Sequence, residues 1–327
     1  MTNHYINSMT KKELKIVFFG TPEFAVASLD KLVSNGYNVA AVVTMPDKPA
    51  GRGHHIVQSD VKKYALGKEL PILQPEKLKS EDFIDKLKEI NADLFIVIAF
   101  RMLPEIVWTM PRLGTFNLHA SLLPKYRGAA PINWAVINGD KETGVTTFFL
   151  KHEIDTGDII QQKKISIAPS DNVGIVYDKL MNLGADMVIE TVDSIINGNF
   201  STIPQQNLTG VEQTPAPKIF RDTCHIAWDR PAERIHNLIR GLSPYPAAWT
   251  EFEKDGKPMQ IKIFESSLTD MPVGNAIPGT IKTDKKDIYV ACADKYLQIV
   301  SLQLSGKKRM FSDEFLRGYC LTDMIMK

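Results

Sequence analysis

The first half of the chain alternates short apolar runs with segments of helical period. Residues 15–20 form an apolar run that ends in glycine, and a helix start follows, with Thr21 as the predicted N-cap and Pro22 in the first helical position. Apolar side chains recur at three- and four-residue spacing through residues 25–33, and Gly36 ends the segment. Because another apolar run comes next, the chain opens as a strand–helix–strand unit of the parallel type.

The same alternation continues to residue 196. Further strands are predicted at residues 39–44, 94–99, 115–118, 145–150 and 159–167, and further helices at residues 81–90, after Pro104 and at residues 173–196. Such a regular alternation is typical of an α/β domain with a doubly wound, mainly parallel sheet of the Rossmann-like kind. We predict this domain over residues 14–203, preceded by a disordered leader at residues 1–13.

The pattern changes after Gly198. Residues 200–217 contain three prolines and show neither a helical nor a strand period, so we predict an interdomain linker at residues 204–217. A helix is predicted at residues 232–242, and short strands at residues 249–253, 259–266, 279–282, 287–292 and 296–303. Short strands separated by turn signals indicate a second domain, residues 218–327, that forms a small OB-like β-barrel.

Composition narrows the class of protein. Hydrophobic residues at 44% and charged residues at 24% are ordinary for a globular chain, and the most apolar stretch, residues 94–100, is too short to cross a membrane. The N-terminus lacks the apolar core of a secretion signal. Three widely spaced cysteines indicate neither a disulfide framework nor a metal site, so we expect a cytoplasmic protein. With a net charge of +1, a nucleic-acid surface must be a local patch.

The turn after the first strand does not fit a nucleotide site. It begins Gly20-Thr21-Pro22, which is not the glycine pattern of dinucleotide-binding proteins, and Pro22 lacks an N–H that a pyrophosphate would use. No phosphate-binding P-loop pattern occurs elsewhere in the chain. The turn therefore joins a strand to a helix, and a role in lining a substrate pocket stays open.

Two polar side chains mark one strand of the sheet. Asn117 and His119 lie two residues apart, so both point to one face, while Leu118 points to the other. At the carboxyl end of a strand in an open α/β sheet, that face opens into the ligand crevice. An amide beside an imidazole suits acyl transfer, because both groups can stabilise a developing oxyanion. Taken alone, however, such a pair is more often structural.

A carboxylate on the next strand strengthens this interpretation. Asp155 follows the strand expected beside the first one and could orient the imidazole and favour its charged form; Asp158 could do the same. No serine or cysteine lies in a nucleophile-elbow pattern, which argues against a covalent acyl-enzyme. No metal is expected, since His119 and His152 have no second ligand at a diagnostic spacing.

These motifs resemble the folate-dependent formyltransferase superfamily. The resemblance rests on Asn117-x-His119, on Ser121 to Pro124 and on Asp155 to Asp158. Further segments, at residues 46–53, 126–132, 243–249 and 306–310, are similar to the members that formylate methionyl-tRNA, so the resemblance covers residues 14–320.

The resemblance implies a site and a donor. Asn117, His119 and Asp155 would be the catalytic residues, and 10-formyltetrahydrofolate would supply the formyl group. The folate would lie against two segments, which are Phe100, Arg101, Met102 and Leu103 on one side and Ser121, Leu122, Leu123 and Pro124 on the other. Many relatives carry Tyr and Gly before the Leu-Pro of the first segment, and here Phe100 keeps an aromatic ring.

The resemblance also implies a partner, the initiator methionyl-tRNA. In the loop at residues 46–53, Lys48 and Arg52 would contact the acceptor end, and Lys307, Lys308 and Arg309 on the barrel would contact the phosphate backbone. Each group could also be a solvated loop with no ligand. We expect a monomer with no membrane partner. In the expected reaction, the α-amine of the methionyl-tRNA attacks the formyl carbon directly.

Three alternatives remain. A formyltransferase acting on a sugar nucleotide or a purine precursor would need neither the loop at residues 46–53 nor a basic barrel. An RNA-binding protein with an inactive catalytic domain would not need Asn117, His119 and Asp155. A hydrolase would use the same three residues with water in place of the amine.

Overall fold

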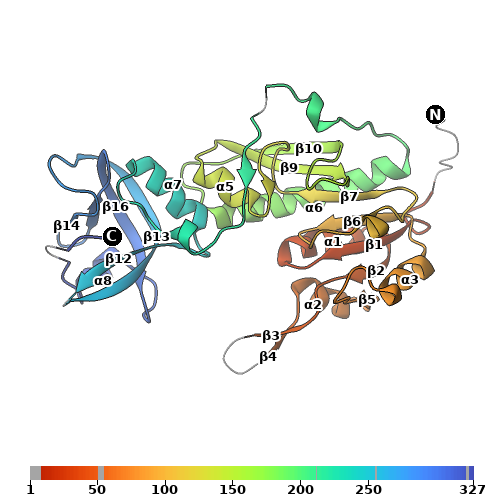
Figure 1. Cartoon of the computed structure of the whole chain (residues 1–327), viewed down its shortest axis with the longest axis horizontal. Coiled ribbons are helices and arrows are strands. Elements are labelled where there is room, and N and C mark those ends of the chain that lie inside the picture. Colours follow the sequence, from red (N-terminus) through yellow and green to blue (C-terminus); the bar gives the residue numbers. More distant parts are fainter. Residues whose placement is uncertain (1–8, 51–54, 211, 255, 322–323) are drawn as a thin grey trace. The chain divides into compact units, whose positions relative to one another are not determined.

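The computed structural model describes residues 9–50, 55–210, 212–254, 256–321 and 324–327 (Figure 1). Arg52 and most of the predicted leader lie outside these residues. The chain divides into two compact units: the first takes residues up to 128, 144–165 and 178–215, and the second takes residues 129–143, 166–177 and 216–327. The predicted domain boundaries at residues 203 and 217 stay predictions.

A seven-stranded sheet forms the centre of the first unit. Its order is β10-β9-β7-β6-β1-β2-β5, and β9 runs antiparallel to β7, whereas β7, β6, β1, β2 and β5 are mutually parallel. The strands are β1 (Lys15–Gly20), β2 (Asn38–Val43), β5 (Ile72–Leu73), β6 (Leu94–Ile98), β7 (Thr115–His119), β9 (Glu142–Phe149) and β10 (Ile159–Ser166). The predicted doubly wound, mainly parallel α/β fold is confirmed.

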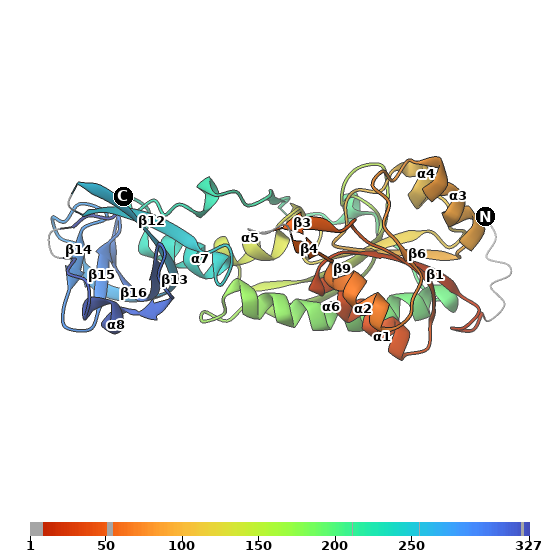
Figure 2. The same cartoon turned by 90° about the horizontal axis from the view of Figure 1, so that it is seen from below.

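Helices cover both faces of this sheet. They are α1 (Glu23–Ser34), α2 (Asp60–Gly67), α3 (Glu81–Ile90), α4 (Glu105–Trp108) and α6 (Val173–Ile196). Figure 2 shows α1 and α6 on one face and α3 and α4 on the other. All five residues of β6 are buried, as expected for a strand covered on both sides. No helix in the described ranges is long and apolar enough to cross a membrane.

The observed helix ends can be compared with the predicted ones. The predicted bounds of α3 and α6 match the structure, but the N-cap of α1 is Pro22 and not Thr21. Pro22 has an extended backbone (φ −83°, ψ 174°), and its carbonyl accepts a hydrogen bond from the N–H of Ala25, so it stands just outside the helix. The sequence did not predict α2, whose N-cap Ser59 accepts a hydrogen bond from the N–H of Lys62.

The remaining elements before the second sheet are short. They are β3 (Lys48–Ala50) and β4 (His55–Val57), which pair antiparallel, β8 (Arg127–Gly128), α5 (Pro131–Ile137), β11 (Pro215–Ala216), and two 3-10 turns, η1 (Gln205–Asn207) and η2 (Asp222–Cys224). Of these, η1 and β11 lie within the segment predicted as a linker.

A curled antiparallel sheet forms the second unit. Its order is β12-β13-β16-β15-β14, with β17 beside β16, and the bounds are β12 (Ala248–Lys254), β13 (Lys257–Pro272), β14 (Ile281–Thr283), β15 (Ile288–Ala291), β16 (Lys295–Leu304) and β17 (Met310–Phe311). Two helices accompany it, α7 (Ala232–Leu242) and α8 (Ser312–Leu316). Near the C-terminus, Met326 bridges to Phe252 of β12 and Ile325 bridges to Thr280 beside β14, so these residues join the two edges of the sheet.

The interior of this barrel-like sheet gives a test of the fold. Phe252 is 2% exposed and lies in the core with Ile261, Leu302 and Phe315. We expect Phe252→Ala to lower the free energy of unfolding by about 3–5 kcal/mol, because it leaves a cavity among fixed neighbours. The measurement is denaturant unfolding of the full chain followed by tryptophan fluorescence. The control is Phe220→Ala, whose ring is 62% exposed and whose loss should change little; equal effects would contradict this core.

Candidate active site

The strand β7 carries the two predicted catalytic side chains. Asn117 and His119 alternate with Leu118, which packs towards α6 at Gly184, where a Cβ would come within 2.8 Å of a Leu118 methyl. Asn117 and His119 therefore share the opposite face of the sheet. Neighbours on both sides hold the strand, since Asn117 pairs in register with Val97 of β6 and Phe148 of β9.

A backbone carbonyl fixes the imidazole of His119. The ring is buried, and its Nε2 lies 2.8 Å from the carbonyl oxygen of Tyr126. Because a carbonyl oxygen can only accept, Nε2 must carry a hydrogen. Tyr126 is itself held in the left-handed region (φ 61°), and its N–H donates to the carbonyl of Thr214. The free ring nitrogen, Nδ1, faces the other way.

Asp155 faces that nitrogen. Its Oδ2 lies 3.9 Å from His119 Nδ1 and accepts a hydrogen bond from the N–H of Gly128 at 3.0 Å. Both side chains are largely buried, which strengthens their interaction relative to one in water. Asp158, the alternative carboxylate, instead forms an ion pair with Lys151 at 2.7 Å. Of the two carboxylates, Asp155 is the one beside the imidazole.

The segment from Ser121 to Pro124 follows β7 and is tied down by hydrogen bonds. Ser121 Oγ donates to the carbonyl of Lys125 at 2.6 Å, and the hydroxyl of Thr146 donates to the carbonyl of Ser121 at 2.6 Å. Leu123 packs in a small core with Phe148 and Ile159, while Leu122 is only half-buried. The segment is a firm wall, and Leu122 is its most accessible apolar side chain.

The segment after β6 has two kinds of residue. Phe100 contacts Phe19 edge-on, with ring centroids 5.7 Å apart, and Leu103 is buried in the same core. By contrast, Met102 is 72% exposed, and the Arg101 guanidinium lies 5.7 Å from the centroid of the Phe100 ring. The Arg101 guanidinium donates to the carbonyls of Pro75 and Glu76, and its partial burial lowers its pKa from the ordinary value.

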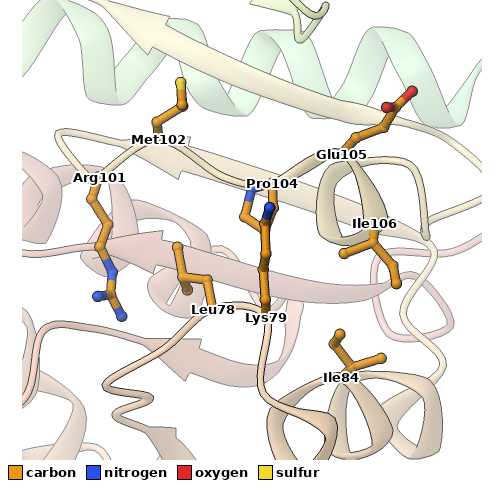
Figure 3. A pocket seen from close by; sticks show the side chains of 8 residues that line it. All are labelled: Leu78, Lys79, Ile84, Arg101, Met102, Pro104, Glu105 and Ile106. Carbon is orange, nitrogen blue, oxygen red and sulfur yellow. The ribbon is translucent and has the colours of Figure 1, made fainter.

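A pocket of about 620 Å³ opens beside Arg101 and Met102 (Figure 3). Its lining consists of Leu78, Lys79, Ile84, Arg101, Met102, Pro104, Glu105 and Ile106. This set is mainly apolar with a few charged groups, as in small-molecule sites. The lining does not include the catalytic candidates or Ser121 to Pro124. The structure therefore places only two of the eight predicted folate residues in this pocket.

Lys48 lies on the short β3–β4 hairpin, exposed and paired across the strands with Val57. Residue Arg52, the other predicted contact of this loop, is outside the described residues. The base of the hairpin is fixed by Asp47, which accepts from Lys62 at 2.6 Å and from Gln74 at 2.8 Å. These two hydrogen bonds, the one from Lys62 first, lower the pKa of the Asp47 carboxyl.

The three predicted cations of the second unit differ from one another. Lys307 and Lys308 are exposed in the turn between β16 and β17. Arg309 bonds to Ser301 Oγ at 2.8 Å, pairs with Glu265, and lies over the ring of Phe264 at 4.6 Å. Its guanidinium is therefore occupied within the protein, and it supports the turn that presents the two lysines.

Comparison with known proteins identifies the family. Residues 14–192 match the model of the formyl transferase family, and residues 218–320 match the model of the formyl transferase C-terminal domain. The chain is 61% identical over 318 residues to a methionyl-tRNA formyltransferase of Bacteroides fragilis, covering 96% of this chain and 98% of the relative. The chain belongs to the methionyl-tRNA formyltransferase family. A second member of this family, from Porphyromonas gingivalis, is 50% identical over 317 residues, covering 96% of this chain and 98% of the relative.

Solved structures support the fold of this methionyl-tRNA formyltransferase family member. An N-formyltransferase from Helicobacter canadensis, solved with folinic acid and dTDP-3-aminofucose, matches with a TM-score of 0.63 and 21% identity, covering 91% of this chain and 100% of that one. At this identity the likeness concerns the fold alone.

The sequence did not indicate the groups that hold the two catalytic candidates of this family member. The Tyr126 carbonyl and the Gly128 N–H are backbone atoms, and no side-chain motif announces them. Gln205 does act through its side chain, which donates to the carbonyl of Asp155, but no sequence motif indicates this contact either. The run around Arg127 was recognised only through resemblance.

The turn after Asp155 gives a second test. A Cβ at Gly157 would come within 1.6 Å of the carbonyl oxygen of Phe149, so even alanine must displace backbone there. We expect Gly157→Ala to destabilise the protein and to raise hydrogen exchange of the amides at residues 155–159. The same change at Gly67, where a Cβ would meet nothing within 4 Å, should leave both quantities unchanged. Equal exchange in the two variants would show that the turn is not packed as described.

Proposed function

We propose that this protein transfers the formyl group of 10-formyltetrahydrofolate to the α-amino group of methionyl-initiator tRNA. The observation that carries the proposal is the 61% identity to a methionyl-tRNA formyltransferase over nearly the whole of both chains. The buried pair formed by His119 and Asp155 supports a direct acyl transfer. We further propose that the protein acts in the cytoplasm and as a monomer.

The reaction proceeds by attack of the amine on the formyl carbon. A C–N bond forms, and the formyl oxygen takes on negative charge. Asn117 and the His119 imidazolium stabilise this oxyanion, and Asp155 accepts the amine proton through a water molecule. The oxyanion then re-forms the C=O bond as the bond between the formyl carbon and the folate nitrogen breaks, and that nitrogen takes up the proton that Asp155 had accepted.

The geometry of His119 supports its part in this scheme. Its Nε2 hydrogen is committed to the Tyr126 carbonyl, so in the neutral ring Nδ1 offers only a lone pair. In the imidazolium form, Nδ1 becomes a donor on the side of Asp155, where a carboxylate stabilises the positive charge. The ring can therefore donate to an oxyanion only when it is charged.

In this proposal, the folate donor contacts both a wall and a pocket. Ser121 to Pro124 form one wall, and the pocket beside Arg101 and Met102 receives the part of the folate that extends away from the reacting centre. Phe100 and Leu103 anchor the segment that carries Arg101 and Met102 to the core of the sheet domain.

The tRNA contacts come from both units. Lys48 on β3 and Arg52 contact the acceptor end, and Lys307 and Lys308 contact backbone phosphates. Arg309 holds their turn through Glu265 and Phe264.

The assay is formyl transfer to charged initiator tRNA, with elongator methionyl-tRNA, an amino-sugar nucleotide and water as competing acceptors. Preference for any of the last three would refute the proposal.

The catalytic roles give a third prediction. His119→Ala and Asp155→Asn should each lower kcat by about 100-fold or more with little change in tRNA binding, because the lost interactions act on the transition state. Asp158→Asn is the matched control, since its carboxylate is paired with Lys151, and it should do much less. Rapid-quench measurement of formyl transfer at saturating substrates gives kcat. A reversed order of the two aspartates would show that the wrong carboxylate is assigned.

The loop at residues 46–53 gives a fourth prediction. Arg52→Ala, and to a smaller degree Arg52→Lys, should lower kcat/KM for initiator tRNA by about tenfold or more, the loss expected for one bidentate contact worth about 1–3 kcal/mol. Discrimination against elongator tRNA should fall as well, while folate binding stays the same. Both tRNAs are compared at one salt concentration, with Lys88→Ala on α3 as the control. If both values and their ratio stay at the wild-type level, the loop is not a tRNA contact.

A further inference from the structure

A buried glutamine lies against the turn that carries Asp155. Gln205, in the 3-10 turn η1, is 4% exposed. Its Nε2 donates to the carbonyl of Asp155 at 2.8 Å and to the carbonyl of Gly157 at 2.9 Å. Its Oε1 accepts from Arg127, from Nε at 3.1 Å and from Nη2 at 2.6 Å. Both donors and both lone pairs of the amide are used.

Only one orientation of the Gln205 side-chain amide fits its hydrogen-bond partners. The two carbonyls can only accept and the guanidinium can only donate, so exchanging the oxygen and nitrogen of Gln205 would break all four hydrogen bonds. A buried amide that is fully bonded in one orientation is a rigid support. Two backbone hydrogen bonds of 2.9 Å between Ile159 and Ile203 hold the adjoining chain beside the turn.

The backbone that Gln205 supports is strained. Asp155 has φ 56°, in the left-handed region that non-glycine residues seldom adopt. Such conformations persist where the surroundings hold them, and they gather at functional sites. The two hydrogen bonds from Gln205 fix the backbone directly after this strained residue, since one goes to the carbonyl of Asp155 and the other to that of Gly157.

Arg127 links this turn to the support of His119. It lies between Tyr126, whose carbonyl bonds to His119 Nε2, and Gly128, whose N–H bonds to Asp155 Oδ2. The Arg127–Gln205 contact therefore joins the segment that fixes the imidazole to the turn that fixes the carboxylate.

We propose that Gln205, locked by Arg127, is a positioning residue that sets the separation of Asp155 and His119. It touches neither substrate and acts through the carboxylate. This inference rests on the proposed function, because it assumes that the pair is catalytic. It gives a catalytic task to a segment that follows the last helix of the sheet domain and that composition marks as a linker.

One substitution separates positioning from simple anchoring. Gln205→Glu keeps an acceptor for Arg127 but has no N–H for the carbonyls of Asp155 and Gly157. If Gln205 only anchors its segment to Arg127, this variant should work normally. If it positions the turn, kcat should fall by about tenfold or more, since displacement of a catalytic group by about 1 Å can cost 100-fold. The KM values for both substrates should change little.

The experiment measures formyl transfer by the full chain. Gln205→Glu and Gln205→Ala are compared with Gln206→Glu, a change at the exposed neighbouring glutamine that should leave kcat unchanged. Gln205→Ala is included so that the test stands if the buried carboxylate prevents folding. Each Gln205 variant is then combined with Asp155→Asn. A residue that acts through Asp155 should cost little further once that carboxylate is gone.

The outcomes are distinct. Wild-type kcat in the Gln205 variants, or a loss that is additive with that of Asp155→Asn, would overturn the positioning role. If Asp155→Asn by itself has wild-type kcat, the proposed catalytic pair fails, whatever the Gln205 variants do. A kcat loss in Gln205→Glu that is absent in the Asp155→Asn background is the result that we expect.

Discussion

The hydrogen bond between His119 Nε2 and the Tyr126 carbonyl is the constraint on which the rest of the site depends. It decides which imidazole nitrogen faces Asp155, and it does so with backbone, which cannot change its role from acceptor to donor. Tyr126 adopts φ 61°, which places its carbonyl against His119 at the end of β7. Hydrogen bonds of the preceding segment, Ser121 to Lys125, and the Thr214 carbonyl hold this strained backbone.

The long elements of the fold could be predicted because they carry a full period. The bounds of α3, α6 and α7 were predicted as observed, since several turns of apolar spacing and an end signal agree in each. By contrast, α2 and α5 have 8 and 7 residues, too few for the period to stand out. Strand β13 runs over Lys257–Pro272, well beyond residues 259–266, because its second half pairs with β16 while showing several exposed side chains.

The residues of the site also differ in whether local sequence spacing could predict their positions. Asn117 and His119 could be predicted because their spacing on one strand fixes their face. The choice between Asp155 and Asp158 depends on how a loop returns to the sheet, and spacing along the chain does not contain that. Arg309 is a further case, because the sequence predicted its contact with tRNA, which stays a prediction, but not its contacts with Glu265 and Phe264.

The segment after α6 shows that a change in composition need not be a boundary of function. Prolines and the lack of a period mark residues 204–217 as a linker, yet Gln205 is bonded to the Asp155 turn and the Thr214 carbonyl accepts from Tyr126. Two points of one irregular segment thus hold the backbone beside His119 and beside Asp155, the two residues proposed as the catalytic pair. A chain cut at residue 203 would lose both supports together with residues 216–327 of the second unit. The roles of the two units are therefore separated by point substitutions such as Lys307→Ala, which leave these hydrogen bonds in place.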